Sequence, residues 1–583
     1  MNTAAIFHSS TIPWSYPINE NQLMIRLQTD VDVEKVFLRW GDPFEGGILG
    51  GNWDWTGTKT EITHTQQIGT ILLWSIIIEP PYKRCRYQFE LHQGNEIWHY
   101  GEKGACTVAQ FENKEVASFY QPWMNKADIP TPPSWVGDTI WYQIFPDRFF
   151  RGTASPQEQG LTPWQQGEVT NDQRYGGNLP GITEKLDYLK DLGISGLYLN
   201  PIFSAASMHK YDTTDYYTVD PHFGTNKDLA TLVQEAHKRN IKVMLDGVFN
   251  HCGPYFAPWL DVVQKGPQSP YWGWFMVHTW PLKDTWGSTK DGRYYSFAFH
   301  GGMPKFNTNN PQVIDYLCDL CIHWVKEYKI DGIRFDVGNE VSHRFLKAVR
   351  QRVHQISPDI YLIGEIWHNS VPWLLGDEYD SVMNYPLRTA ITEFFHDTRK
   401  TSRQLVWDIR RCLTMYCTQH NPAMFNLLDS HDTERLWNRT PNPDTFLQQL
   451  ALLFTLPGSP CIYYGTELAL PGGHDPDCRR CMEWNPSPTQ QEMYKEIQAL
   501  IALRNTNPEL RTAEADIQEG DTDRCFTITR ENIKIWINAS ETQWAIPLPK
   551  EILYHHGKRS HTFRSCTMEK AELEPGGILI GRI

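Results

Sequence analysis

Eight short apolar runs alternate with amphipathic stretches through the middle of the chain, and this alternation restricts the folds open to it. Stretches of helical period include 312–329, 343–356, 403–417 and 490–504, together with the spaced residues Ile182, Leu186 and Leu189. Eight strand–helix units in succession predict a parallel (β/α)8 TIM barrel. We expect this barrel over 126–505, with strands at 139–144, 194–199, 241–245, 332–335, 360–363, 380–383, 424–428 and 461–464.

Short runs in which apolar and polar residues alternate lie on both sides of the barrel segment. Residues 1–125 predict an N-terminal β-sandwich, with strands near 23–27, 36–40, 71–78, 85–91 and 97–100. A proline-rich linker follows at 129–134. Runs at 526–529 and 533–537 predict a small C-terminal β-domain over 506–583. The chain is therefore expected to be a multidomain α/β protein.

The connection after the third barrel strand is too long for a simple loop. It covers about 251–306 and is rich in proline, glycine and aromatic residues. A structureless loop of this length is uncommon in a compact domain. We therefore expect an inserted subdomain there, over the face where TIM-barrel active sites lie.

Four segments place an acid or a histidine at the end of a predicted barrel strand. They are Asp246-Gly-Val-Phe-Asn-His251, Gly332-Ile-Arg-Phe-Asp336, Gly364-Glu365-Ile-Trp367 and Leu428-Asp-Ser-His431-Asp432. The ends of parallel strands meet at one face of a barrel, so these groups should converge on one pocket. Among them, the carboxylates of Asp336, Glu365 and Asp432, with one arginine and two histidines, indicate acid/base chemistry on a neutral polar substrate. Cleavage of a glycosidic bond is the favoured interpretation.

The residue types suggest separate roles for two of the acids. Arg334 and Asp336 are two positions apart on a strand and point to the same side. A guanidinium there would keep the carboxylate ionised and fix its rotamer, which suits a nucleophile; a structural ion pair is the alternative. Glu365 precedes the apolar patch Ile366 and Trp367. Such surroundings favour a protonated carboxyl group and suit a general acid.

Asp432 and the two histidines complete this set. Asp432 could bind substrate hydroxyls or tune Glu365. A single histidine is usually structural, but His251 and His431 lie at matching strand ends beside acids. We therefore expect both histidines to bind sugar hydroxyls.

Composition excludes several classes of function. The net charge is −14 and no dense basic run occurs, which argues against a nucleic-acid surface or an anionic membrane as partner. No apolar run approaches the roughly 18–20 residues of a spanning helix, and no signal peptide is visible, so a cytoplasmic location is expected. Aromatic residues make up 13%, as large cores or a sugar-binding site would require.

The 12 cysteines are scattered, and buried reduced thiols are the expectation. A zinc site built from Cys318-x-x-Cys321 and Cys478-x-x-Cys481 is the weaker alternative.

The four segments resemble the four signature regions of the α-amylase superfamily. Met303-Pro-Lys-Phe-Asn307 resembles a fifth, and its first three residues are typical of the neopullulanase, cyclomaltodextrinase and maltogenic amylase subgroup. Asp336-Val-Gly-Asn-Glu340 is similar to that subgroup, whereas typical α-amylases carry Lys-His at its end. Gly364-Glu-Ile-Trp-His368 and the run from Gly473 to Arg480 also fit. One departure is Gly332-Ile-Arg-Phe-Asp336, where the subgroup often has Gly-Trp-Arg-Leu-Asp.

This resemblance spans nearly the whole chain and implies a retaining mechanism. Asp336 would attack the anomeric carbon, Glu365 would act as general acid and then base, and Asp432 would bind hydroxyls and help distort the ring. It further implies substrate-binding residues around them. His251, Arg334 and His431 would bind at the same subsite and Tyr211 would stack under its sugar; Asp475 and Arg479 would lie one subsite further, and Asn339, Glu340 and Trp367 on the acceptor side.

The implied activity is hydrolysis of α-1,4-glucosidic bonds in cyclodextrins, pullulan and short maltooligosaccharides or starch, with some transglycosylation. A transglycosylase on the same scaffold is the alternative. A catalytically silent sugar-binding protein is a second alternative, against which the intact acids Asp336, Glu365 and Asp432 argue.

The resemblance also bears on partners and cofactors. In relatives the N-terminal domain mediates dimerisation, so a homodimer is expected; a raw-starch-binding module using Trp40, Trp53 or Trp55 is the alternative. Relatives often bind calcium through an Asp/Asn cluster after the first strand. The loop 147–156 lacks such a carboxylate cluster, so no tightly bound calcium, and no other cofactor, is expected.

Overall fold

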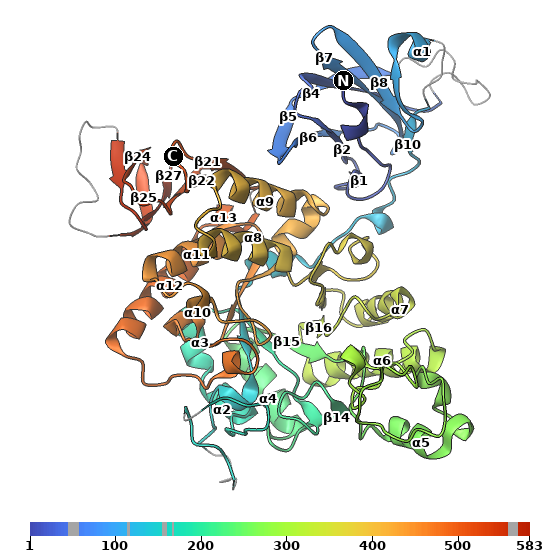
Figure 1. Cartoon of the computed structure of the whole chain (residues 1–583), viewed down its shortest axis with the longest axis vertical. Coiled ribbons are helices and arrows are strands. Elements are labelled where there is room, and N and C mark those ends of the chain that lie inside the picture. Colours follow the sequence, from blue (N-terminus) through green and yellow to red (C-terminus); the bar gives the residue numbers. More distant parts are fainter. Residues whose placement is uncertain (45–56, 113–116, 154–159, 166–167, 513, 558–569) are drawn as a thin grey trace. The chain divides into compact units, whose positions relative to one another are not determined.

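The predicted eight barrel strands form one parallel sheet in the computed structural model, which describes the chain except residues 45–56, 113–116, 154–159, 166–167, 513 and 558–569 (Figure 1). Their order is β18-β17-β16-β15-β12-β11-β20-β19, and a parallel bridge between Met383 and Phe425 joins the two outer strands. This bridge closes the barrel and confirms the predicted fold class. The strands are β11 (Trp141–Ile144), β12 (Gly196–Leu199), β15 (Lys242–Gly247), β16 (Gly332–Phe335), β17 (Tyr361–Gly364), β18 (Ser381–Val382), β19 (Phe425–Leu427) and β20 (Ser459–Tyr463).

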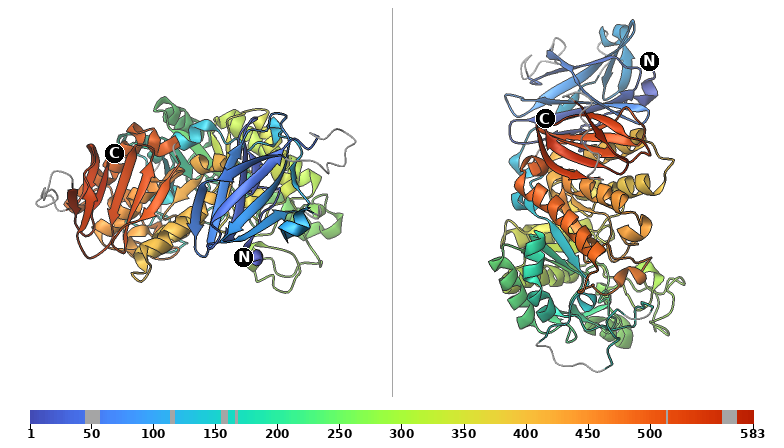
Figure 2. Two further views of the ribbon diagram at one scale, coloured as in Figure 1. Left: turned by 90° about the horizontal axis from the view of Figure 1, so that it is seen from above. Right: turned by 90° about the vertical axis from the view of Figure 1, so that its left-hand side faces the viewer.

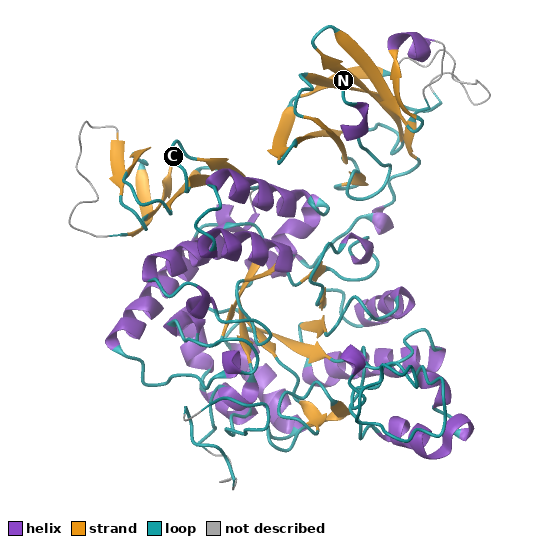
Figure 3. Cartoon of the chain, viewed as in Figure 1, coloured by secondary structure: helices purple, strands orange, loops and turns teal. Residues whose placement is uncertain are grey.

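Barrel strands are apolar on both faces because the sheet is covered inside and outside. Side chains such as Trp141, Tyr198 and Met244 fill the centre, and helices surround the sheet (Figure 3). These helices are α2 (Leu179–Glu184), α3 (Leu186–Leu192), α4 (Asn226–Lys238), α6 (Pro311–His323), α7 (His343–His354), α8 (Tyr385–His396), α10 (Leu436–Arg439), α11 (Pro443–Thr455), α12 (Pro488–Thr506) and α13 (Glu509–Thr512).

Two predicted helices are interrupted. The helix expected around Ile182 and Leu189 is broken at Lys185, which separates α2 from α3. The helix expected over 312–329 ends as α6 at His323, continues as a π-helical turn and stops at Lys329, whose φ is +59°. Periodicity reports which face is buried, and it is insensitive to a local change of helix type.

The inserted subdomain contains one helix, α5 (Ala257–Lys265), and little other regular structure. Isolated bridges hold the rest: His251–Lys305 at its base, then Phe275–Phe306, Val277–Tyr294, Ser288–His300 and Ser296–Pro304. A short hairpin of β13 (Phe203–Ala205) and β14 (Thr213–Val219) lies in the preceding connection and carries Tyr211 between its strands.

The chain divides into two compact units, and the first contains residues 1–131 with 374–376 and 403–421. Its core lies between two antiparallel sheets, as expected for a sandwich (Figure 2). One sheet has the order β1 (Ser15–Pro17), β2 (Leu23–Asp30), β6 (Ile71–Ile78), β5 (His64–Ile68). The other has β4 (Thr58–Ile62), β3 (Lys35–Gly41), β7 (Cys85–Gln93), β8 (Glu96–Gly101), β9 (Gly104–Thr107), with β10 (Phe119–Gln121) on β7.

This first unit also includes α1 (Val108–Glu112) and residues of α9 (Ser402–Thr414). The buried Arg26 on β2 donates to the carbonyl oxygens of Thr414, at 2.8 Å, and Tyr416, at 3.2 Å. These bonds tie the helix end to the sandwich because a guanidinium can satisfy several carbonyls that a helix terminus leaves unpaired.

The C-terminal strands form two further antiparallel sheets in the second unit. The larger has the order β21 (Asp516–Glu519), β22 (Cys525–Arg530), β23 (Ile533–Asn538), β27 (Ile578–Arg582), β25 (Glu551–His556). The smaller pairs β24 (Trp544–Pro547) with β26 (Lys570–Leu573). Across the described part of the chain, no helix has the length and apolar character needed to cross a membrane.

Candidate active site

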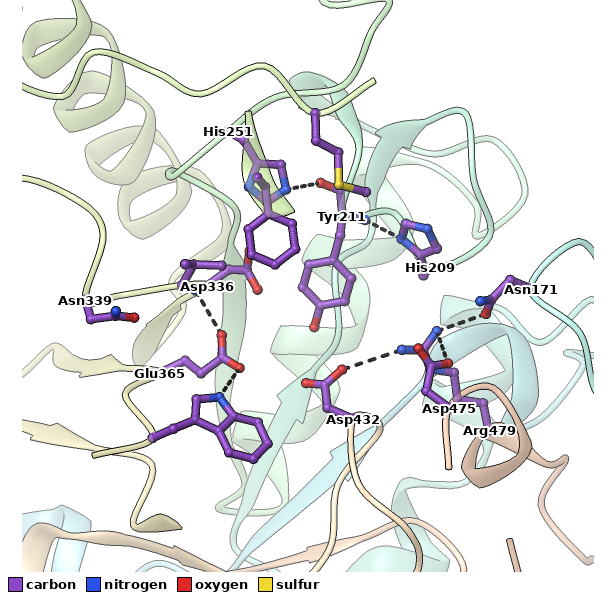
Figure 4. A pocket seen from close by; sticks show the side chains of 14 residues that line it. Asn171, His209, Tyr211, His251, Asp336, Asn339, Glu365, Asp432, Asp475 and Arg479 are labelled. Carbon is purple, nitrogen blue, oxygen red and sulfur yellow. Dashed lines mark hydrogen bonds and ion pairs between the residues drawn. The ribbon is translucent and has the colours of Figure 1, made fainter. Parts of the chain in front are cut away.

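The four acidic segments end in one cavity of about 460 Å³, as the barrel geometry predicts (Figure 4). Nine of the twelve predicted site residues line it; Arg334, His431 and Glu340 do not. The lining residues are Asn171, His209, Tyr211, His251, Phe297, Met303, Asp336, Val337, Asn339, Glu365, Trp367, Asp432, Asp475 and Arg479.

Arg334 lies beneath the cavity, fully buried, and binds three carboxylates at once. Its Nη1 donates to Asp246 Oδ1 at 2.8 Å and to Asp336 Oδ1 at 2.9 Å. Its Nη2 lies 2.9 Å from Glu365 Oε2. One guanidinium thus joins the predicted nucleophile and the predicted acid. Arg334 is buried and does not line the cavity, so its predicted contact with sugar stays a prediction.

The surroundings of Glu365 are more polar than the apolar sequence around it suggests. Besides the contact with Arg334, its Oε2 accepts the Val337 N–H at 2.9 Å, and its Oε1 accepts Trp367 Nε1–H at 3.1 Å. Val337 has a φ of +47°, a left-handed conformation that β-branched residues rarely adopt. Such a residue costs roughly 1–3 kcal/mol and is usually kept at functional sites.

Two acids of the cavity, Asp336 and Asp432, have raised pKa values, and burial is the largest cause. Burial raises the pKa of Asp336 well above its usual range; Arg334 opposes this effect, and Glu365 adds to it. Arg334 thus favours the ionised form of Asp336, as expected, but burial acts in the opposite direction and is the larger effect. Burial and the charge of Glu365 raise the pKa of Asp432 to about 7. Asp432 therefore titrates near neutrality, inside a group of buried acids.

Tyr211 forms a rigid floor for part of the cavity. Its ring stacks on that of His431, with centroids 5.4 Å apart and planes within 7°. Its hydroxyl donates to Asp246 Oδ2 at 3.0 Å. Gln143 Nε2–H donates to His431 Nδ1 at 2.8 Å, so His431 carries its proton on Nε2, 2.6 Å from the Tyr211 hydroxyl. His431 therefore supports Tyr211 from behind.

His251 is also engaged by the protein. Its Nε2 donates to the Tyr211 carbonyl oxygen at 3.1 Å, and its Nδ1 accepts from Asn250 Nδ2 at 3.2 Å. Burial lowers the pKa of His251 to about 3, so the ring is neutral. Its ring stacks on Phe297 at 5.0 Å and forms part of the wall. Both ring nitrogens thus have partners within the protein, and the hydroxyl contact of His251 stays a prediction.

His209 is a lining residue that the sequence reasoning missed. Its Nδ1 accepts the Tyr211 N–H at 3.1 Å, which makes Nε2 the donor atom of the ring. Burial lowers the pKa of His209 to about 4. Its position two residues before Tyr211 in one loop was the available signal.

Arg479 organises the far wall of the cavity. Its Nη1 lies 2.9 Å from Asp475 Oδ1 and donates to Asn171 Oδ1 at 3.0 Å. Its Nη2 lies 3.5 Å from Asp432 Oδ1. Asn171 was not predicted, because the loop that carries it has no strand or helix pattern.

The opposite end of the cavity contains Asn339 and Trp367. Trp367 is 48% exposed and stacks on Tyr385 with ring centroids 3.7 Å apart. Glu340 lies outside this lining, and its carboxylate binds Lys305 at 2.8 Å.

The loop after β11 offers little for a cation. The carboxylate of Asp147 accepts from Arg148 Nε at 2.6 Å and from the N–H groups of Tyr175 and Gly176 at about 3 Å. Residues 154–156 of the predicted loop lie outside the described residues. Elsewhere in the described ranges, no three His, Cys, Asp or Glu side chains gather as a ligand set, and eleven cysteines are free and buried.

Asp432 should make stability depend on pH. Its pKa rises from 3.8 to about 7 on folding, so the native state binds more protons than the unfolded state between these values. The free energy of unfolding therefore falls as pH rises through this window. The Tm of the parent should fall between pH 5 and pH 8. The Tm of Asp432→Asn should fall by a smaller amount over the same range, and the two decreases should differ by on the order of 2 °C.

Thermal melts at both pH values test this. Asp397→Asn is the matched control, because hydrogen bonds from Arg399 lower the pKa of the partly exposed Asp397 to about 2, below the window. An equal loss of Tm in the parent and in Asp432→Asn would contradict the prediction.

Comparison with known proteins places this geometry in a family. Residues 143–539 match the α-amylase catalytic domain, and residues 1–125 match the α-amylase N-terminal Ig-like domain. A cyclomaltodextrinase of Geobacillus thermopakistaniensis (strain MAS1) is 42% identical over 94% of this chain and 93% of its own. An intracellular maltogenic amylase of Bacillus subtilis is 40% identical, and the match covers 88% of this chain and 86% of the relative's own length.

A solved cyclomaltodextrinase structure superposes with a TM-score of 0.88 at 34% identity and covers all of both chains. The family models, these relatives and the barrel site agree. The chain belongs to the α-amylase family.

Proposed function

We propose that the protein is a retaining hydrolase of α-1,4-glucosidic bonds in cyclodextrins, pullulan and short maltooligosaccharides. The observation that carries the proposal is the single guanidinium of Arg334, which binds both Asp336 and Glu365 at the cavity floor. Retaining enzymes need their two carboxyl groups only about 5–5.5 Å apart. A shared arginine supports such close spacing. The names of the relatives, cyclomaltodextrinase and maltogenic amylase, support the substrate class.

The reaction would proceed in two displacements. Asp336 attacks the anomeric carbon as the bond to the leaving oxygen breaks, and Glu365 gives that oxygen its proton. The sugar is then held as an ester on Asp336. In the second step Glu365 takes a proton from water, which attacks the same carbon and releases Asp336. Two inversions leave the anomeric configuration unchanged.

The surrounding residues would hold the reacting sugar in this geometry. The Tyr211 ring faces the cavity and is fixed by Asp246 and His431, so it offers a stacking surface at little entropic cost. Asp432 and Arg479 supply charged hydrogen-bonding groups for hydroxyls on the same side.

Transfer to a second sugar is the alternative outcome of the same intermediate. Exposed Trp367 donates to Glu365 and stacks on Tyr385, which presents an aromatic face next to the acid/base. A sugar held there would compete with water. We therefore expect some transglycosylation beside hydrolysis.

Product analysis tests the proposed substrates. β-Cyclodextrin should be opened rapidly to maltose and glucose, pullulan should yield panose, and soluble starch should be cut more slowly. The anomer released first, followed by NMR, should be α. Starch cut faster than cyclodextrin would contradict a narrow site, and a β product would contradict retention.

The two acids should respond differently to substitution. Asp336→Asn should abolish turnover of every substrate. Glu365→Gln should lose about 10²–10⁴-fold on maltooligosaccharides but much less on an aryl α-maltoside, whose leaving group needs no proton. The kcat/KM on each substrate measures this, because it reports the first displacement, in which Glu365 acts as the acid, and not the second, in which it acts as the base. Asp187→Asn, an exposed acid on α3, serves as control. Equal losses on both substrates in Glu365→Gln would argue against its role as acid.

We infer that the N-terminal sandwich mediates a homodimer. The indole N–H of Trp40 donates to Thr60 Oγ1 at 3.1 Å, which leaves this ring less free to bind starch, while Trp53 and Trp55 lie outside the described residues. Sedimentation velocity at micromolar concentration should give a dimer. A monomer alone at that concentration would favour the starch-binding alternative.

A cytoplasmic location is part of this proposal. Its support is the name of an intracellular relative and the eleven free cysteines among the described residues. Recovery of the native protein from culture medium would refute it.

We also propose that activity needs no tightly bound calcium, because the described part of the loop after β11 offers the single carboxylate of Asp147, already bonded to Arg148. Dialysis against EDTA should leave the rate on β-cyclodextrin unchanged. Loss of activity that calcium alone restores would overturn this.

A further inference from the structure

Two exposed aromatic side chains of the inserted subdomain lie together outside the cavity. Trp286 is 52% exposed and Tyr255 is 55% exposed. Their ring centroids are 5.7 Å apart, with planes at 62°. Apolar surface left in water forgoes the favourable free energy that its burial would contribute. Paired exposed aromatics on an ordered loop therefore indicate a binding surface more than a packing remnant.

This aromatic pair is continuous with the wall of the cavity. Tyr255 comes four residues after His251, which lines the cavity. The Trp286 ring lies against Gly302: a Cβ added there would stand 3.3 Å from Trp286 Cε3. The next residue, Met303, lines the cavity, and the His251–Lys305 bridge brings the two segments together. The two rings thus adjoin the edge of the cavity wall.

The loop that presents Trp286 is held in one conformation. Asp284 Oδ1 accepts the N–H groups of Trp286 and Gly287, each at 2.9 Å. Arg293 Nη2 donates to the Gly287 carbonyl oxygen at 2.9 Å. The Tyr294 hydroxyl donates to the Gly301 carbonyl oxygen at 2.8 Å. Because the backbone is fixed before a ligand arrives, binding on the ring costs little conformational entropy.

We propose that Trp286 and Tyr255 form an outer subsite that stacks a glucose unit of an α-glucan longer than the cavity itself can hold. The occupant follows from the continuity with Met303, since a chain bound in the cavity that continues past this residue meets the Trp286 ring. The apolar C–H face of a pyranose matches the flat face of an indole. This inference rests on the proposed function, because it extends the same substrate beyond the reacting bond.

The proposed subsite should make the KM depend on the length of the glucan chain. In Trp286→Ala, the ratio of the KM for maltotriose to the KM for maltoheptaose should fall about three- to tenfold, since only the longer chain reaches the ring. Trp286→Phe should keep most of the parent ratio because it retains an aromatic face. Trp280→Ala is the matched control: Trp280 is 44% exposed in the same subdomain, but its ring lies against Gly266 beyond α5. It should leave the ratio at the parent value.

Calorimetry in the Asp336→Asn background separates this inference from the proposed function. Maltoheptaose should bind this inactive protein more weakly when Trp286→Ala is added, and maltotriose equally well. If the parent turns over no α-glucan but this difference in binding persists, the proposed function fails and the subsite stands. An unchanged KM ratio and unchanged binding in Trp286→Ala would overturn the subsite.

A second copy of the chain is the other possible occupant of these rings. In that case Trp286→Ala would weaken self-association in sedimentation while the KM ratio stays at the parent value. That result would also overturn the proposal.

Discussion

The buried guanidinium of Arg334 is the interaction on which the site depends. The parallel register pairs Asp246 on β15 directly with Arg334 on β16, and Phe335 with Gly364 on β17, so Glu365 follows beside Asp336. Three carboxylates could not be buried at such close range without a cation, because a desolvated, unpaired charge is costly. Arg334 makes the cluster possible and sets the spacing of its members.

The same crowding supplies the chemistry. Burial raises the pKa of Asp336 and of Asp432, and the charge of Glu365 adds to both shifts. The left-handed Val337 beside them is a further local cost. The site is thus unfavourable for stability and favourable for catalysis. The packing of the closed barrel around it offsets this local loss of stability.

Neutral, hydrogen-bonded rings shape the cavity around these acids. The Tyr211 hydroxyl is hydrogen-bonded to His431, and the Tyr211 carbonyl oxygen accepts a hydrogen bond from His251. The inserted subdomain contributes Met303 and Phe297 to the wall and Trp286 beyond it. Segments far apart in the chain therefore line one cavity with aromatic rings, which suits a substrate with flat apolar faces and many hydroxyls.

The sequence by itself determined the barrel, its eight strands and the acids Asp336, Glu365 and Asp432, because apolar runs report burial and parallel strands bring their ends together. Tertiary structure alone decided what the other groups do. The ring nitrogens of His251 and His431 bond to Asn250, Gln143 and Tyr211, partners that no local pattern predicts.

Asn171 and His209 reach the cavity from loops whose course no periodicity encodes. Likewise, the polar contacts of Glu365 come from Arg334 and the strained Val337, although its neighbours in sequence are apolar. Local pattern reports which face of an element is buried. The partner of a buried polar atom depends on long-range register and loop paths, which only the folded chain defines.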